Sequence, residues 1–265
     1  MELKRWLTAL CLTPLLLLIV GYGSKPVFFG LILIITLIAI HEFYALVLPE
    51  NHRKEKVLGT LLGLLLAYGI YRSEGPLVLG ILTFIIIFLF IFFLAPNHNR
   101  SSVVLSIGKL LMGILYVALL LPHLVLIRGM PFGKEWVFFT LAVTLMGDTA
   151  SYFGGSYFGR HKLYPSVSPG KTIEGSIGGF IGNIGMALIF RKYFLSQVEV
   201  YHCLVLAMGL GIMGQVGDLC ESMVKRNAGV KDSGKLLPGH GGMLDRIDSI
   251  LFSAPFLYYY AILIL

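Results

Sequence analysis

The sequence predicts an all-α protein that crosses the membrane several times. Hydrophobic residues make up 57% of the 265 positions and charged residues only 13%, whereas about 25% of a typical soluble domain is charged. The apolar residues form long runs, and a membrane-spanning helix needs roughly 20 of them. A soluble globular domain is excluded, because so few charges could not cover its surface. The cysteines (Cys11, Cys203 and Cys220) are too few and too scattered for a disulfide or metal framework.

Nine apolar runs qualify as spans, so we expect about nine transmembrane helices. They cover residues 6–23, 26–48, 57–72, 76–95, 102–126, 135–154, 173–190, 201–219 and 247–265. The third run is short, and the fifth contains Lys109. The first run follows Lys4 and Arg5, as in a signal peptide, but no A-x-A-like cleavage site follows Val20, so a retained helix is expected.

The distribution of Lys and Arg predicts the orientation of the chain. Fourteen of the 21 basic residues fall at the N-terminus or in every second connection between the predicted spans. Basic residues are enriched in cytoplasmic loops. We therefore expect a cytoplasmic N-terminus and a C-terminus outside. The expected location is the inner (cytoplasmic) membrane of the cell, with the active site at its cytoplasmic face.

The acidic residues divide the sequence into two parts. The first 147 residues contain no aspartate, and all five aspartates lie after residue 147. This shift predicts an N-terminal transmembrane scaffold of about five helices over residues 1–130 and a C-terminal catalytic transmembrane domain over residues 131–265. Within the second part, the connections 155–172 and 220–246 are long and rich in Gly, Pro and charge. Both are expected in the cytoplasm.

The connection 155–172 and the span before it contain the first group of candidate residues. Asp148 lies inside an apolar run, where an ionisable side chain is costly and indicates function; a structural partner for a cation is the alternative. The run 170–172 resembles the end of a P-loop, but Pro165 occupies a required glycine position and no strand precedes it, which excludes that motif. Lys171 and Thr172 still lie near a helix start, where free amides favour phosphate.

The connection 220–246 is denser in charge. Asp218 and Glu221 are three residues apart, as are Asp245 and Asp248, so each pair shares one helix face. Mg²⁺ typically takes one or two carboxylates and completes its shell with phosphates and water. The pattern therefore predicts a magnesium–phosphate site, with a solvated loop as the alternative. Between or beside these acids stand the basic and glycine residues Lys225, Arg226, Lys231, Lys235, His240, Gly241, Gly242 and Arg246.

The 27 residues from Ser222 to Asp248 resemble the signature of phosphatidate cytidylyltransferases (CDP-diacylglycerol synthases) throughout. Residues 148–175 are also similar to that family, except that Gly170 stands where a second lysine often precedes the Lys-Thr pair. The first half resembles it only as hydrophobic spans, which include the His-Glu-Phe-Tyr run 41–44. The resemblance implies transfer of CMP from CTP to phosphatidic acid, giving CDP-diacylglycerol and pyrophosphate in phospholipid biosynthesis.

The roles expected of the residues follow from this reaction. The phosphate of phosphatidate is itself the nucleophile, so in-line positioning and charge neutralisation should suffice. We expect Asp218 and Asp245 to be the chief metal ligands, with Asp248 and Glu221 as further ligands or their neighbours. Asp218, Asp245, Asp248, Lys225 and Arg226 form the expected catalytic group. The expected phosphate-binding residues are Asp148, Lys171, Thr172, Lys225, Arg226, Lys231, Lys235, His240, Gly241, Gly242 and Arg246.

The resemblance also implies cofactors and partners. It implies Mg²⁺ and allows a potassium ion beside it. The partners are CTP, phosphatidic acid, the lipid bilayer and a second copy in a homodimer, and no nucleic-acid partner is expected. The Gly-x-x-x-Gly spacings within residues 175–182 permit close helix contacts, either within one chain or between two copies.

Two other functions remain as alternatives. One is a CTP-dependent polyprenol or lipid kinase, or a CDP-archaeol-type synthase, of the same superfamily; the 27-residue signature argues against both. The other is an ion-coupled transporter with Asp148 and Asp218 as ion ligands. Transporters often contain paired internal repeats, and the sequence contains no evident repeat.

Overall fold

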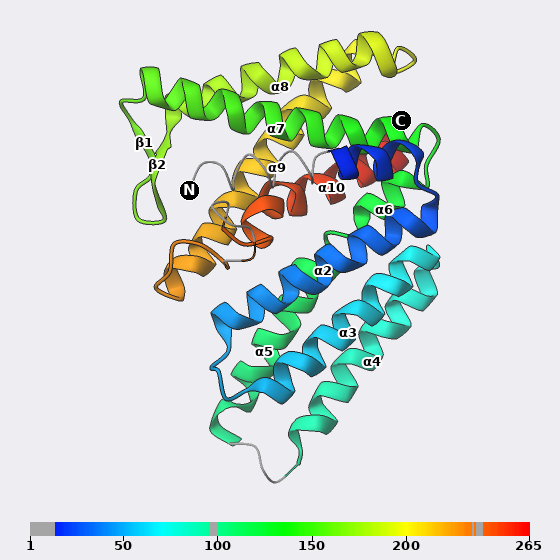
Figure 1. The fold of residues 1–265 in the computed structure, drawn as a ribbon, viewed down its shortest axis with the longest axis vertical. Coiled ribbons are helices and arrows are strands. Elements are labelled where there is room, and N and C mark those ends of the chain that lie inside the picture. Colours follow the sequence, from blue (N-terminus) through cyan, green and yellow to red (C-terminus); the bar gives the residue numbers. More distant parts are fainter. Residues whose placement is uncertain (1–13, 96–99, 235, 237–240) are drawn as a thin grey trace. The chain divides into compact units, whose positions relative to one another are not determined.

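The computed structural model describes residues 14–95, 100–234, 236 and 241–265, and this part is mainly helical (Figure 1). Residues 14–22 form a helix. The remaining elements are α2 (Lys25–Val47), α3 (Arg53–Arg72), α4 (Gly75–Phe93), the 3₁₀ turn η1 (Arg100–Ser102), α5 (Val103–Gly113), the π-helical segment η2 (Ile114–Leu119), α6 (His123–Arg128), α7 (Gly133–Phe158), β1 (Lys162–Tyr164), β2 (Ser168–Thr172), α8 (Ile173–Phe194), α9 (Val200–Asn227) and α10 (Leu244–Ile264).

Six helices in the described part are long and apolar enough to cross a membrane. They are α2, α4, the run Val103–Arg128, α8, α9 and α10. An all-α membrane protein is therefore confirmed, whereas the count of nine spans and the orientation of the termini stay predictions. The predicted spans 57–72 and 135–154 form α3 and α7, which are not among the six. The predicted span 6–23 lies partly outside the described residues.

The connections in the second half are shorter than expected, because the helices before them are longer. The α7 helix continues to Phe158 and α9 to Asn227. The strands β1 and β2 form an antiparallel hairpin in which Lys162 lies opposite Thr172, a feature that an all-α prediction lacks. Strands of 3 and 5 residues are too short for a recognisable alternation, and Pro169 in β2 argues against a strand.

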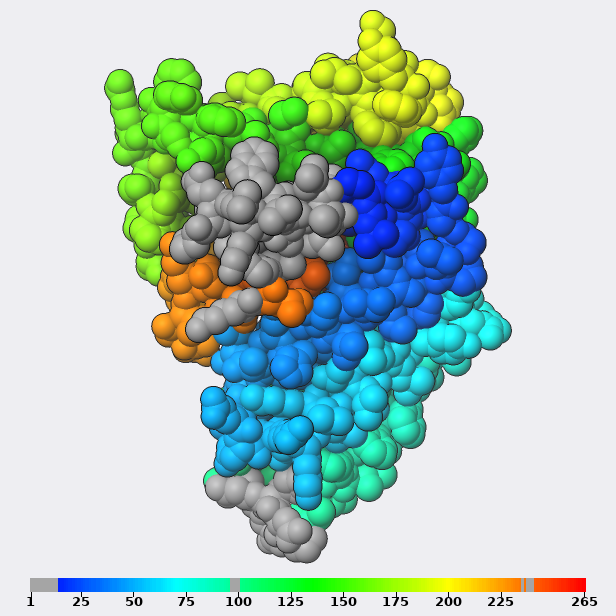
Figure 2. Space-filling model, viewed as in Figure 1, coloured from blue at the N-terminus to red at the C-terminus, as the bar shows by residue number. Residues whose placement is uncertain are grey.

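The described helices and strands form two compact units. The first comprises Met1–Leu126 with Asp232–Leu244, and the second comprises Ile127–Lys231 with Asp245–Leu265. In the first unit, α3 lies between α2 and α4, and these helices make a continuous blue-to-cyan surface (Figures 1 and 2). Prolines in the first turn begin α2 and α4, a position where the missing amide hydrogen is not needed.

Tyr44 organises the core of the first unit. Its side chain is completely buried, and its hydroxyl donates a 2.8 Å hydrogen bond to the carbonyl oxygen of Leu110. The ring lies so close to Gly59 and Gly113 that a Cβ atom at either position would overlap with it. A buried hydroxyl needs such a partner, and the glycines let α2, α3 and α5 approach closely.

In the second unit, α7 and α8 run side by side and α9 packs against them (Figure 1). The predicted Gly-x-x-x-Gly residues of α8 face α7. A Cβ at Gly179 would overlap Ser151, and one at Gly182 would lie 2.6 Å from the Cβ of Ala150. The intramolecular interpretation of this spacing is therefore confirmed, and the homodimer stays a prediction.

Candidate active site

A cavity of about 600 Å³ in the second unit brings together four of the five aspartates. Asp148 comes from α7, Asp218 from α9, and Asp245 and Asp248 from the first turns of α10. The end of the hairpin and the start of α8 contribute Ser168, Gly170, Lys171, Thr172, Gly175 and Ser176. The two charged segments that the sequence analysis singled out thus share one cavity.

The hairpin delivers Lys171 to this cavity. The Lys171 Nζ atom lies 2.7 Å from Oδ2 of Asp218, whose other oxygen accepts a 3.3 Å hydrogen bond from the Ser222 hydroxyl. The next residue, Thr172, ends β2 and caps α8 by accepting a 3.1 Å hydrogen bond from the Gly175 amide. Strand and helix cap therefore fix the backbone on both sides of the lysine.

The α9 and α10 helices are joined by a buried ion pair. The ammonium of Lys225 lies 2.6 Å from Oδ1 of Asp245 and also contacts the carboxylate of Glu221 one turn earlier on α9. The Glu221 side chain has 0% exposure and does not line the cavity. Buried charges are tolerated when they are paired, so Lys225 makes it possible for both acids to lie in the interior.

Comparison with known proteins identifies the family. The model of the cytidylyltransferase family matches residues 3–264. The chain belongs to the cytidylyltransferase family. A phosphatidate cytidylyltransferase of Bacillus subtilis is 32% identical over 235 residues, which are 84% of this chain and 87% of that protein. One of Staphylococcus saprophyticus is 38% identical over 170 residues, 64% of each chain. The uncharacterized protein YnbB of Escherichia coli is 48% identical over 128 residues, 48% of this chain and 43% of its own length.

The lining of this cytidylyltransferase cavity suits a magnesium ion that arrives with a nucleotide. It contains four carboxylates and one lysine, so negative charge is in excess. Among the described residues, no three His, Cys, Asp or Glu side chains are grouped to enclose a metal by themselves. Mg²⁺ does not need such a cage, because it accepts one or two carboxylates together with phosphate and water oxygens. The hard oxygen atoms of Asp218 and Asp245 fit this requirement, and Asp248 lines the same cavity.

The other predicted phosphate-binding residues that the structure describes are not part of the cavity lining. Arg226 donates hydrogen bonds to the carbonyl oxygens of Val167, at 3.2 Å, and Val230, at 2.8 Å, so it ties the hairpin to the end of α9. Lys231 and Arg246 are exposed. Gly241 and Gly242 belong to the first unit. Lys235 and His240 lie outside the described residues. The roles predicted for these residues stay predictions.

Seven polar residues line the cavity although none of them was predicted as a site residue: Ser151, Tyr152, Ser156, Ser168, Ser176, Gln215 and Ser249. Ser151 lies three residues after Asp148, Gln215 lies three residues before Asp218, and Ser249 follows Asp248. Residues three apart on a helix are neighbours on one face. The helical spacing from each aspartate was therefore the signal that could have found Ser151 and Gln215.

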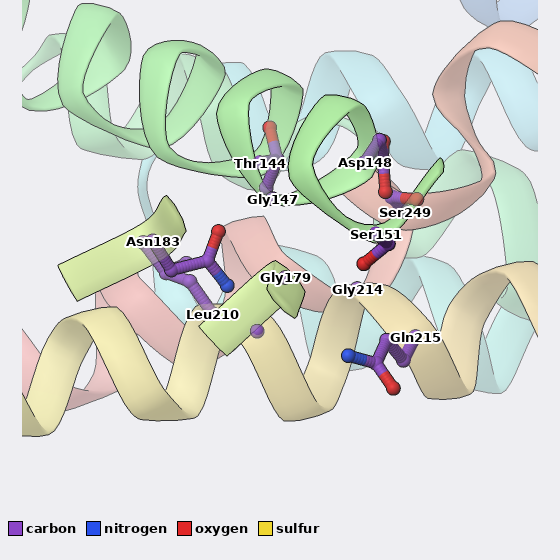
Figure 3. Close-up of a pocket in the computed structure, with 11 residues that line it drawn as sticks. Thr144, Gly147, Asp148, Ser151, Gly179, Asn183, Leu210, Gly214, Gln215 and Ser249 are labelled. Carbon is purple, nitrogen blue, oxygen red and sulfur yellow. The ribbon is translucent and has the colours of Figure 1, made fainter. Parts of the chain in front are cut away.

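A small polar cavity adjoins the large one and shares several of its lining residues (Figure 3). Its volume of about 10 Å³ approaches the volume needed for one water molecule. Asn183 of α8 reaches this cavity and is only 2% exposed. Its amide fits against Gly147 of α7 and Gly211 of α9, where a Cβ at either position would overlap it. Polar side chains therefore line both cavities, and the small cavity extends the polar region in between the packed helices α7, α8 and α9.

Proposed function

We propose that the protein is a phosphatidate cytidylyltransferase, which transfers CMP from CTP to phosphatidic acid and releases pyrophosphate. The observation that supports this most is the cavity in which Lys171 meets the four aspartates of α7, α9 and α10. Family membership over nearly the whole chain and curated relatives of that name support the same reaction. The product, CDP-diacylglycerol, serves phospholipid biosynthesis.

The reaction requires two anions to approach each other. A phosphatidate oxygen forms a bond to the α-phosphorus of CTP, the bond to the oxygen leading to the β-phosphorus breaks, and pyrophosphate leaves with that electron pair. The attacking phosphate is ionised near neutral pH, so the protein supplies positioning and charge neutralisation. Lys171 offers an ammonium group to the phosphates, and Lys225 holds Asp245 in place through its 2.6 Å contact.

Magnesium completes this charge balance. Asp218 and Asp245 would hold the ion, with Asp248 as a further ligand or a neighbour, whereas Glu221 is engaged with Lys225. When bound, Mg²⁺ neutralises charge on the transferred and departing phosphates. A potassium ion beside it remains part of the proposal, on the family resemblance alone.

The proposal includes a location. The protein lies in the inner membrane with the cavity at the cytoplasmic face, where CTP arrives from water and phosphatidate from the leaflet. The excess of basic residues in the predicted cytoplasmic connections supports this orientation. A homodimer is proposed from the family resemblance.

The decisive experiment measures pyrophosphate release from CTP by the purified protein in detergent. Release should require both Mg²⁺ and phosphatidate. With CTP labelled in the cytosine ring, label should appear in the lipid product. A lipid product that carries phosphate without cytosine label would identify a CTP-dependent kinase instead, and solute uptake without pyrophosphate release would identify a transporter.

Substitution of the predicted metal ligands tests the assignment of the site. Asp218→Asn and Asp245→Asn should each lower turnover by at least about 100-fold, the loss typical of one group that stabilises transition-state charge. Both variants should still insert into the membrane. Glu50→Gln makes the same carboxylate-to-amide change at an exposed position after α2 and should retain full activity. Near-normal turnover of either aspartate variant would refute the assignment.

A further inference from the structure

A buried glutamate of α2 holds both ends of the glycine-rich segment 232–244, which packs with the first unit. Glu42 is 7% exposed. Its Oε2 atom accepts hydrogen bonds from the Ser233 hydroxyl at 3.0 Å and the Leu244 amide at 2.9 Å. Its Oε1 atom accepts one from the Met243 amide at 3.0 Å. One side chain therefore fixes two points of the segment that are ten residues apart.

These donors explain why a carboxylate is tolerated in an apolar helix. An ionisable group in a membrane-spanning segment is expensive unless polar partners satisfy it. Here both carboxylate oxygens are satisfied, and hydrogen bonds to an ionised acceptor are stronger than neutral ones. Leu244 is the first residue of α10, so the negative charge also lies at the favourable end of that helix.

Two glycines of the 222–248 signature pack directly against Glu42. A Cβ atom at Gly234 would lie 2.5 Å from Oε1 of Glu42. A Cβ at Gly242 would overlap both Oε2 of Glu42 and the hydroxyl of Ser233. The presence of glycine at these positions thus follows from the space that the carboxylate occupies. These two glycines therefore pack with Glu42, although 190 or more residues separate Glu42 from its hydrogen-bond donors Ser233 and Leu244.

We propose that Glu42 is a positioning residue for cytidylyl transfer. Glu42 accepts hydrogen bonds from the Met243 and Leu244 amides and thereby fixes the start of α10. The next residue in the chain is Asp245, which lines the cavity of about 600 Å³ with three other aspartates (the aspartate cavity). This inference rests on the proposed function, since it assigns Glu42 to that reaction. Glu42 touches no reacting atom itself and acts through the backbone of the segment.

The test compares Glu42→Gln, Glu42→Asp and the exposed control Glu50→Gln in the purified full-length protein. In Glu42→Gln one oxygen becomes an amide nitrogen that cannot accept a hydrogen bond, so deuterium exchange at the amides of residues 243 and 244 should speed up. We expect kcat per folded molecule to fall about 10- to 100-fold, the loss that follows a displacement of about 1 Å at a catalytic group. Glu42→Asp keeps the charge and should recover part of kcat, whereas Glu50→Gln should match the unaltered protein.

Ser233→Ala provides a second variant, should Glu42→Gln fold poorly. It removes one of the three donors and leaves the carboxylate and both amide contacts, so a smaller change in the same direction is expected. A kcat per folded molecule within about twofold of the unaltered protein, in Glu42→Gln or in Ser233→Ala, would overturn the positioning role. If the unaltered protein releases no pyrophosphate from CTP while the exchange at residues 243 and 244 still depends on Glu42, the proposed reaction fails and the contact itself stands.

Discussion

Lys225 forms ion pairs with two acids at once. Its ammonium contacts Glu221, which has no exposed surface, and Asp245, whose side chain is 8% exposed. Asp245 also lines the aspartate cavity. Removing one partner of a buried ion pair leaves an uncompensated charge, which costs far more than an exposed pair contributes.

Replacing Lys225 with methionine should therefore destabilise the folded protein by about 3–5 kcal/mol. The measurement is the free energy of unfolding in detergent. Arg72→Met is the matched control: Arg72 pairs with Glu74 at the surface, where both side chains are about half exposed, and its loss should cost at most about 1 kcal/mol. Adding Glu221→Gln to Lys225→Met should restore part of the stability. An equal loss of unfolding free energy in Lys225→Met and Arg72→Met would contradict the buried pairing.

At the scale of single elements, small residues set the spacing of α7, α8 and α9. The Asn183 amide occupies the space beside Gly147 and Gly211. Larger side chains there would push apart helices that also carry Asp148 and Asp218. Packing between these helices and the geometry of the cavity are therefore coupled.

Gly147→Ala should lower stability by about 1–3 kcal/mol, the usual cost of overpacking a close contact. Thermal unfolding in detergent measures it. Gly185→Ala is the control on α8, since a Cβ there meets no atom within 4 Å and alanine favours the helix. Combining Gly147→Ala with Asn183→Ala should recover stability, because the overlapping amide is removed. No recovery would mean that Asn183 is not the group that excludes a Cβ at position 147.

The sequence predicted those elements whose signal lies in a continuous run of residues. Apolar runs identified the helices, and the three-residue spacing of Asp218 and Glu221 placed both on α9. The β1–β2 hairpin was not predicted because its strands are too short to show an alternation and β2 contains Pro169. The role of Glu42 was not predicted either, although Glu42 is a charged residue within an apolar run. Its hydrogen-bond partners lie 191 to 202 residues away in the sequence.

At the scale of the whole molecule, the orientation in the membrane is the main prediction to check. A cysteine at Leu265, in a protein whose native cysteines are replaced by serine, should react with a membrane-impermeant maleimide in intact cells. Lys162→Cys, at the exposed hairpin, should react only after the inner membrane is opened. The reverse pattern would invert the topology, and labelling of both positions from the same side would contradict the predicted number of crossings between them.

The contacts of Glu42 also bear on how the protein is made. A chain is synthesised from its N-terminus, so the amides of Met243 and Leu244 emerge 201 and 202 residues after Glu42. Until then the carboxylate lacks the donors that hold it in the finished fold. The hydrogen bonds that satisfy Glu42 can therefore form only after the chain has been synthesised as far as the start of α10.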